Sequence, residues 1–326
     1  MINRDLITVK NLAVYLIEGE DRLSRKYVTL EEAMDRQLIV LRETGDVGEL
    51  AVDNPSDKYV FIMSGDIVRG GRQDRTIADD IILKPKSMDV PLKSFCVEQS
   101  RWHRRGGESD RFFSASKKGK PSRDIALAVR SKNQSEVWSE VERFQICASA
   151  AVCENVRSSE SESSLELTLD NDKLKSAVKE YLDVLRPAFE ARNSVTGFAY
   201  SINGRISMSE SFGSAALFRQ LRDKLLESAA NEAVLKSSDK TCANHPTVED
   251  VTNFLIAAKG GSVTIRNTGE ITLEKRYDTP QSILYKTFHV EADKEEKVHT
   301  VAYNTCDREA GRSNSEQRFR YGGVRR

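Results

Sequence analysis

The alternation of hydrophobic and polar positions predicts a β-rich start to the chain. "ITVKNLAVYLIEG" (residues 7–19) predicts one strand, because β-branched and aromatic residues dominate it. "YVTLEEAMDRQLIVL" predicts a short helix that Thr29 caps, with Glu32 completing a capping box. "ELAVDNPSDKYVFIMSGD" predicts a strand, an Asn-Pro turn and a second strand, and the apolar core Tyr59–Met63 places that second strand centrally in a sheet.

The middle of the chain predicts amphipathic helices. "SEVWSEVERFQICASAA" (135–151) and "NDKLKSAVKEYLDVLRPAF" (171–189) space their apolar residues three and four positions apart, and a third helix is predicted from Ala215 to about Lys236. The segment between the first two, "NVRSSESESSLELTLD" (155–170), begins Ser/Glu-rich and is predicted to be exposed. A short helix capped by Thr247 follows the third.

Strands return toward the end of the chain. "VTGFAYSINGRISMSESF" predicts a β-hairpin that turns at Asn203 and Gly204, and residues 260–304 predict several further strands. The fold class is therefore α+β, with mostly antiparallel sheets and several packed amphipathic helices. The last strands could complete a sheet begun at the start, which favours one composite domain over residues 1–305. A boundary near 155–170 is the alternative, and the basic tail 306–326 is predicted to be disordered.

Composition narrows the function classes. With 326 residues, 39% of them hydrophobic, the chain can bury a substantial core. Its 50 basic and 50 acidic residues balance, so no global field recruits nucleic acid or an anionic membrane. No apolar run reaches about 20 residues and the start lacks a signal peptide, which predicts a cytoplasmic protein. The five cysteines and four histidines are scattered, which predicts free thiols and no metal site.

One segment departs from this balance of charge. Residues 103–122, "HRRGGESDRFFSASKKGKPS", predict a mobile basic loop, and the span from Glu98 to Lys132 holds ten Lys/Arg and four Asp/Glu. The loop offers only Phe112 and Phe113 for stacking on bases. A solvated lid is therefore favoured over a nucleic-acid interface.

The first candidate site is "SGDIVRGGRQDRTI" (64–77). Gly70 and Gly71 would let a ligand approach the backbone closely, and the stretch carries arginines with planar forks suited to phosphate or carboxylate: Arg69, Arg72 and Arg75. The alternative is a glycine turn whose solvated arginines pair with Asp66 and Asp74. Neither of the glycine-rich phosphate-binding patterns is present, so spacing alone favours the turn.

The second candidate site is "SFCVEQSRWHRRGG" (94–107). In an extended chain Cys96, Glu98 and Trp102 share one face, while Gln99 and Arg101 share the other. Glu98 could then act as a general base, Cys96 as a nucleophile and Trp102 as a stacking platform. The alternatives are a small buried apolar residue for Cys96 and a structural ion pair for Glu98.

Both stretches belong to a wider resemblance. The chain resembles a bacterial domain family of unknown function, the ARG-and-rhodanese-phosphatase-superfamily-associated protein domain, over about residues 5–240. The resemblance lies in "YVTLEEAMDRQLIVLRETG", "GELAVDNPSDKYVFIMSGDIVRGGRQDRTI", "VPLKSFCVEQSRW" and "INGRISMSESFGSAALFRQLRDKLLESAANEA". The family's defining residues fall on Gly65, Gly70, Gln73, Arg75, Cys96, Glu98, Gln99, Arg101 and Trp102. This chain departs from the family pattern at Arg72 and Asp74, where the family resembled has Lys and Asn, and the added carboxylate disfavours an anion contact at position 74.

The resemblance implies a link to NAD-derived metabolites such as ADP-ribose. Under this hypothesis Arg75 and Arg101 hold phosphate, Trp102 stacks, and Glu98 is the base if hydrolysis occurs. Further ligand contacts fall on four residues: Gly70, Arg72, Gln73 and Gln99, with Gly71 completing the turn. The rival hypothesis is a non-catalytic module in which the same polar cluster is a buried network and a surface elsewhere binds a protein partner. The sequence identifies no cofactor and no particular protein partner.

Overall fold

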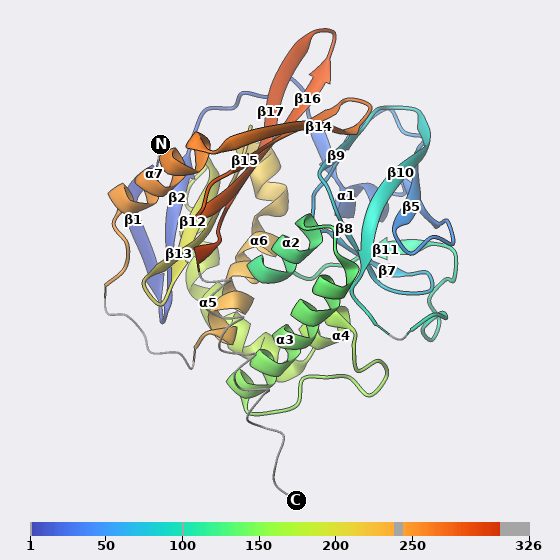
Figure 1. Ribbon diagram of the computed structural model, residues 1–326, viewed down its shortest axis with the longest axis horizontal. Coiled ribbons are helices and arrows are strands. Elements are labelled where there is room, and N and C mark those ends of the chain that lie inside the picture. The colour runs from blue at the N-terminus through green and yellow to red at the C-terminus, as the bar shows by residue number, and fades with distance from the viewer. Residues whose placement is uncertain (1, 100, 238–243, 307–326) are drawn as a thin grey trace, which may run out of the picture.

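The computed structural model describes residues 2–99, 101–237 and 244–306 and has the predicted α+β architecture (Figure 1). A large antiparallel sheet, a group of helices and two smaller sheets make up the molecule. The predicted disordered tail, 306–326, lies outside the described residues except for Cys306.

The large sheet joins the two ends of the sequence. Its eight strands lie in the order β1-β2-β12-β13-β17-β16-β15-β14, and all neighbours are antiparallel. Their bounds are β1 (Ile2–Val9), β2 (Leu12–Glu18), β12 (Val195–Ile202), β13 (Arg205–Phe212), β14 (Ser262–Gly269), β15 (Thr272–Asp278), β16 (Ser282–Glu291) and β17 (Lys294–Asn304). Strands from the end of the chain thus complete a sheet begun at its start, which confirms the prediction of one composite α+β domain.

The start of the chain contains two corrections. The single strand predicted over residues 7–19 is wrong, because the chain turns at Lys10 and Asn11 and β1 pairs back on β2. Lys10 adopts a φ of 51°, which is uncommon for a lysine, so the residue types gave no turn signal. The predicted capping box is also wrong: helix α1 (Leu30–Asp35) begins after Thr29, but the Thr29 side chain makes no capping hydrogen bond.

Two smaller sheets lie beside the helices and contain the candidate stretches. The six-stranded sheet has the order β11-β7-β8-β10-β5-β4, and the three-stranded sheet has the order β3-β6-β9, with β6 central as predicted. Their bounds are β3 (Tyr27–Thr29), β4 (Val40–Glu43), β5 (Glu49–Asn54), β6 (Tyr59–Ile62), β7 (Ile67–Gly70), β8 (Arg75–Ile77), β9 (Ile81–Leu83), β10 (Ser87–Cys96) and β11 (Phe113–Ala115). These sheets share a second apolar core, which includes Leu50, Val60 and Leu92.

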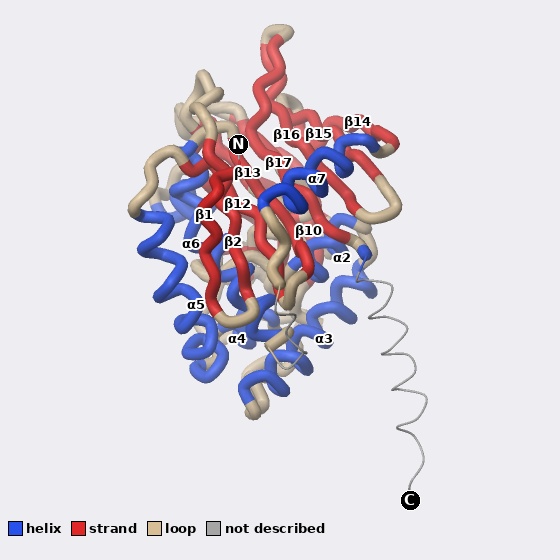
Figure 2. Tube along the Cα trace, turned by 90° about the vertical axis from the view of Figure 1, so that its left-hand side faces the viewer, coloured by secondary structure: helices blue, strands red, loops and turns tan. Residues whose placement is uncertain are grey.

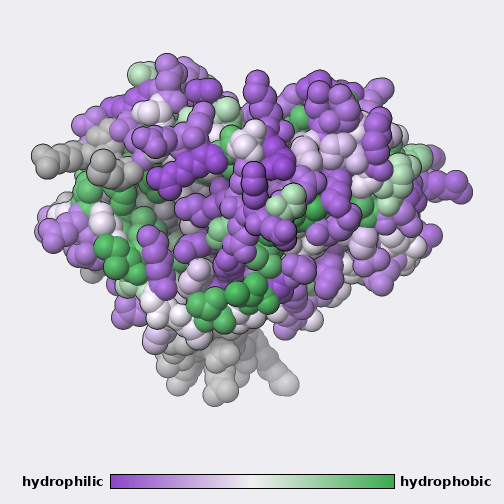
Figure 3. Space-filling view, turned by 90° about the horizontal axis from the view of Figure 1, so that it is seen from above, coloured by the Kyte–Doolittle hydropathy of each residue, from purple (hydrophilic) through white to green (hydrophobic). Residues whose placement is uncertain are grey.

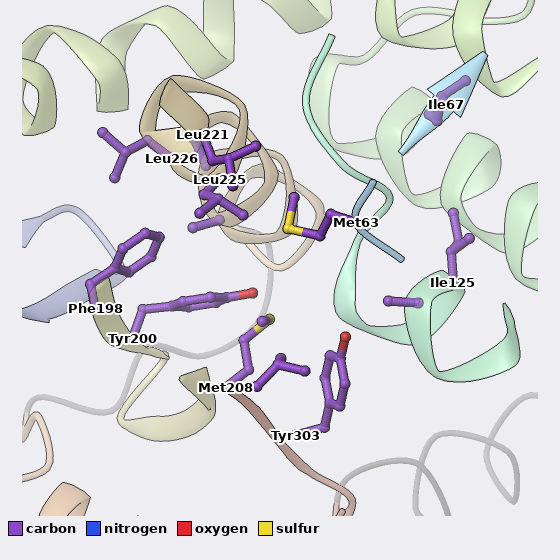
Figure 4. Close-up of a cluster of buried hydrophobic side chains, with 14 of the residues drawn as sticks. Met63, Ile67, Ile125, Phe198, Tyr200, Met208, Leu221, Leu225, Leu226 and Tyr303 are labelled. Carbon is purple, nitrogen blue, oxygen red and sulfur yellow. The ribbon is translucent and has the colours of Figure 1, made fainter. Parts of the chain in front are cut away.

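The predicted amphipathic helices form as α3 (Gln134–Val152), α5 (Asp172–Glu190) and α6 (Ala215–Leu235), and the predicted short helix is α7 (Val248–Ala257). The sequence analysis missed two further helices, α2 (Arg123–Arg130) and α4 (Leu165–Leu169). Helix α4 lies within the segment 155–170 that was predicted to be exposed, and Leu165 and Leu169 are buried. Helix α6 packs on β12, and its Leu221 and Leu225 face Tyr200, Met208 and Tyr303 of the large sheet across the main core (Figure 4). Helix α7, capped by Thr247 as predicted, covers the opposite face of the sheet (Figure 2).

The predicted hairpin is also confirmed. Strands β12 and β13 pair up to Ile202 and Arg205, and Asn203 and Gly204 adopt φ values of 51° and 76° in the two-residue turn. Both central residues of a type I′ turn need positive φ, which is why Asn-Gly is the preferred pair there.

Candidate functional site

The glycine pair forms the turn between β7 and β8, and protein atoms already pack against it. Gly70 and Gly71 have φ values of 115° and 57°, which residues with side chains rarely adopt. A Cβ atom added at Gly71 would lie 2.4 Å from the ring of Phe113, and one added at Gly70 would lie 2.7 Å from the carbonyl oxygen of Phe112. The two glycines therefore allow β11 to approach the turn closely.

Two carboxylates and two guanidinium groups form a buried cluster where this turn meets the chain after β10. Glu98 accepts hydrogen bonds from Arg101 Nε at 2.6 Å and from Arg105 Nη1 at 3.2 Å. Asp74 accepts from Arg101 Nη2 at 3.1 Å and from Arg105 Nη1 at 3.0 Å. The two carboxylate side chains have no exposed surface, and the two arginine side chains are 5% exposed. Each of the four charges therefore lies against both charges of the opposite sign, which offsets part of the cost of removing them from water.

The surroundings of Asp74 shift its ionisation. Its burial, together with the nearby charge of Glu98, raises the pKa of Asp74 to about 6, although Arg105 and Arg101 oppose the shift. The carboxylate is therefore ionised at pH 7 and binds a proton in mildly acidic solution. Because the pKa is raised in the folded state, Asp74 contributes stability below the unfolded pKa of 3.8 that is lost as the pH rises through about 6.

Arg75 lies beside the cluster but points away from it. Its Nη1 donates to the carbonyl oxygen of Val47 at 3.0 Å and to Gln73 Oε1 at 3.2 Å, and its Nη2 donates to Glu43 at 3.4 Å. The Arg75 side chain has no exposed surface. Gln73 is buried as well, and its amide donates to the backbone oxygen of Glu98. Arg75 and Gln73 thus connect the turn to its neighbours and do not reach solvent.

Trp102 covers this region from outside. The residue is 44% exposed, and the guanidinium groups of Arg72 and Arg75 lie 5.3 Å and 5.9 Å from the centre of its ring. Such cation–π contacts contribute about 0.5–1 kcal/mol at exposed sites. The indole therefore keeps one face on the arginines and leaves part of its surface open to solvent.

Cys96 occupies the end of β10 and is fully buried. Burial raises the pKa of its thiol, although the hydrogen bond from the Glu98 backbone N–H lowers it in part. The sulfur donates to the backbone oxygen of Glu98 at 3.1 Å. A thiol with a raised pKa is a weak nucleophile, so these surroundings agree with the interpretation of Cys96 as a small buried apolar residue.

A pocket of about 420 Å³ opens beside the cluster. One wall is the chain after β10, with Gln99, Arg101 and His103, and a second wall is helix α3. The third wall is the Ser/Glu-rich segment around residues 157–163, predicted as an exposed linker. The backbone oxygen of Glu162 accepts from the Gln145 amide at 2.8 Å, and this bond holds the segment against α3. The linker therefore folds back to complete a pocket of the size that small ligands occupy.

The pocket contains charges of both signs. Its ionisable lining residues are Arg101, His103, Glu142, Arg157, Glu160 and Glu162. Arg101 is already neutralised by Glu98 and Asp74, and Arg157 lies 3.8 Å from Glu142. The carboxylates can accept hydrogen bonds from hydroxyl groups, and Arg157 offers five donors to an anionic group.

The predicted site residues separate into two groups by burial. Seven are buried: Gly70, Gly71, Gln73, Arg75, Cys96, Glu98 and Arg101. Three are exposed: Arg72, Gln99 and Trp102. Of all ten, Gln99 and Arg101 line the pocket. The structure thus brings both stretches together at one place, largely inside the protein.

The basic loop supplies a cluster member that the sequence did not single out. Arg105 reaches Asp74 and Glu98 from inside this loop, and its Nη2 also donates to Glu108 at 2.8 Å. Eight of the ten Lys/Arg between positions 98 and 132 form ion pairs: Arg101, Arg105, Lys117, Lys118, Lys120, Arg123, Arg130 and Lys132. Carboxylates of the folded protein therefore neutralise most of the local excess that the sequence shows.

A second buried network was also missed. His299 of β17 lies between Asp80, 2.7 Å from its Nδ1, and Glu210 of β13, 3.0 Å from its Nε2. Lys120 Nζ donates to Glu210 at 2.7 Å, and Arg130 lies 3.4 Å from Asp80. These residues are far apart in the sequence and show no shared motif, so only the tertiary fold reveals the network.

Comparison with known families gives a match that covers most of the chain. The model of the ARG and Rhodanese-Phosphatase-superfamily-associated Protein domain matches residues 4–303, which extends the resemblance seen in the sequence through β17. No curated protein and no solved structure matches the chain. In the described residues, none of the helices has the length and apolar character needed to cross a membrane. The chain belongs to the ARG and Rhodanese-Phosphatase-superfamily-associated Protein domain family.

Proposed function

We propose that the chain binds an anionic, ribose-containing metabolite of the ADP-ribose type in the pocket between α3 and the chain after β10. The observation that carries this proposal is the pocket itself, because Gln99 and Arg101 of the second candidate stretch line it. Its volume of about 420 Å³ lies within the range of about 300–1,000 Å³ typical of small-molecule sites.

The lining of the pocket suits the two parts of such a ligand. Carboxylates of Glu142, Glu160 and Glu162 would accept hydrogen bonds from ribose hydroxyls, and the Gln99 amide would add a further donor and acceptor. Arg157 would pair with a phosphate, since its guanidinium can form two parallel charge-assisted bonds. A cytoplasmic setting is part of this proposal, and the free thiols of Cys96, Cys153 and Cys306 support it.

The geometry supports binding more directly than hydrolysis. Both oxygens of Glu98 are engaged, one by Arg105 and the other by Arg101 and the backbone N–H of Asp74. A general base needs an oxygen free to accept a substrate proton. Catalysis through Glu98 would therefore require the cluster to open, and Glu98 and Cys96 as catalytic groups stay proposals.

The rival function is a non-catalytic module, and the buried cluster favours it. Here the two candidate stretches only stabilise the fold, and the protein acts through a partner that binds elsewhere. The two proposals differ in one respect that can be measured, which is whether the pocket binds a small ligand.

Calorimetric titration with ADP-ribose tests the proposed function. We expect the wild-type protein to bind, and Arg157→Ala to bind about tenfold more weakly or worse, because a charge-assisted pair is worth about 1.5–3 kcal/mol. Arg143→Ala is the matched control, since Arg143 lies on α3 with a similar exposure, 42% against 32%, and does not line the pocket. Absence of binding by the wild type, or equal losses in both variants, would reject the proposal in favour of the module.

A further inference from the structure

The free edges of the three sheets differ in how they are protected. An edge strand presents unpaired N–H and C=O groups and invites another strand, unless it is short, bulged or charged. Four of the six edges are very short: β11, β3 and β9 have three residues each and β4 has four. The fifth, β1, has an irregular register between Ile2 and Leu6 and carries Asp5 in that interval.

The sixth edge, β14, lacks these protections. It is eight residues long, and its register with β15 is regular from Ser262 to Asn267. It contains no proline, and its one charged residue, Arg266, is bonded to Asp79 and Glu274. Among the described edge strands, β14 is therefore long and regular, and carboxylates of the same chain neutralise its one charged residue.

The side chains beside this edge are apolar. Val263 and Ile265 are 52% and 58% exposed, and they share one face of β14 because they are two positions apart. Ile256, near the end of α7, is 60% exposed, and α7 lies across the outer face of the sheet and leads into β14 (Figure 2). The face of the molecule seen in Figure 3 is mostly hydrophilic, with a few hydrophobic patches. Exposed apolar residues that lie close together can mark an interaction surface.

We propose that β14 pairs antiparallel with β14 of a second copy of this chain and joins two eight-stranded sheets across a two-fold axis. An isologous edge contact needs only one strand, since the same N–H and C=O groups complement themselves after rotation. If the axis passes near Thr264, Val263 lies opposite Ile265 of the second copy, and apolar cross-strand pairs of this kind stabilise sheets.

Charge permits this pairing of identical chains. The formal net charge of the chain is zero, so two copies do not repel each other at long range. Because Arg266 is held by its own carboxylates, no like charges meet across the axis. Residues 266–268 line a groove with Pro91–Lys93, which restricts the new pairing to the first half of β14, around Ser262–Arg266.

Sedimentation equilibrium over a wide range of protein concentration tests the interface. We expect the wild type to have twice the 36.6 kDa mass of one chain, and the double variant Val263→Lys/Ile265→Lys to show a twofold lower mass. Two lysines that face each other across the axis would repel, as do the charges that natural edge strands use against pairing. Ile146→Lys is the control, because Ile146 is also an exposed apolar residue, at 50%, but it lies on helix α3 and not on a strand.

Two outcomes would overturn the inference. One is a wild-type protein that is monomeric at every concentration, and the other is a dimer that persists in the folded double variant. If the double variant does not fold, hydrogen exchange of the wild type decides the question. The β14 amides should then exchange faster on dilution, and rates that do not depend on concentration would contradict the proposed pairing. Neither result bears on ligand binding in the pocket.

Discussion

Replacement of Glu98 by alanine is expected to lower the free energy of unfolding by about 3–5 kcal/mol. The substitution leaves Asp74 as the one carboxylate that Arg101 and Arg105 share, and it removes the acceptor for the Asp74 backbone N–H. Glu108 still pairs with Arg105, but Arg101 keeps no other carboxylate partner among those of this cluster. The loss is a large part of the 5–15 kcal/mol by which a protein is typically stable. Urea denaturation followed by circular dichroism measures the change.

The control and the coupled variant make this prediction specific. Glu162→Ala removes an exposed carboxylate of the pocket wall and should change stability by no more than about 0.5 kcal/mol. The double variant Glu98→Ala/Arg101→Ala should lose less than the sum of the two single losses, because Arg101 is partly unpaired once Glu98 is gone. If Glu98→Ala and Glu162→Ala change the free energy of unfolding by the same amount, the buried cluster does not stabilise this part of the fold. Should Glu98→Ala fail to fold, Glu98→Gln removes the charge and keeps the volume.

The second large expected effect is a loss of folding stability in acid, to which Glu210 contributes. Burial alone would raise the pKa of Glu210, but Lys120 and His299 lower it to about 2 from its ordinary value of 4.5. Because the folded pKa is the lower one, Glu210 contributes stability above about pH 4.5 that is lost as the pH falls through about 2. A shift of this size corresponds to about 3 kcal/mol, at 1.36 kcal/mol for each pKa unit.

Unfolding free energies measured between pH 6 and pH 2 test this effect. The wild type should lose stability steeply below about pH 4.5. Glu210→Gln should have lower stability at neutral pH and a shallower slope in acid, since it cannot bind the proton. Glu180→Gln, at a carboxylate that is 60% exposed, should keep the wild-type slope. An unchanged slope in Glu210→Gln would show that another group controls unfolding in acid.

His299 makes folding stability fall as the pH rises, whereas Glu210 makes it fall in acid. Burial would lower the pKa of His299, but Asp80 and Glu210 on either side raise it. A raised histidine pKa contributes stability below the unfolded value of 6.5 that is lost as the pH rises through the folded value. The groups of this one network therefore favour the folded state most at intermediate pH.

Local patterns in the sequence predicted the elements well because they depend on neighbouring residues. The Asn203–Gly204 hairpin follows from backbone preferences of two residues, and the helix around Leu221 follows from its own apolar spacing. The β1–β2 turn at Lys10 was missed because a lysine at positive φ is held there by distant contacts, including the bond from Asn11 to Ala233.

The candidate site was located by residue type, and its burial could not be predicted. Arginine and glutamate in a polar loop are as consistent with an open cleft as with a buried cluster. Two distant contacts bury the cluster. Arg105 reaches Glu98 from a loop that was predicted to be solvated. Ser164 forms a β-bridge with Glu98, although the two residues are more than sixty positions apart. Likewise, Lys120 and Glu210 are 90 positions apart, so no local pattern connects them.

The central claim is that the pocket beside the buried cluster, lined by Gln99 and Arg101, binds an ADP-ribose-like ligand. A crystal structure of the protein soaked with ADP-ribose tests this claim most directly. The account predicts difference density between α3 and the chain after β10, with phosphate near Arg157 and ribose near Gln99. Density at another place, or an empty pocket in crystals of a protein that binds ADP-ribose in solution, would contradict it.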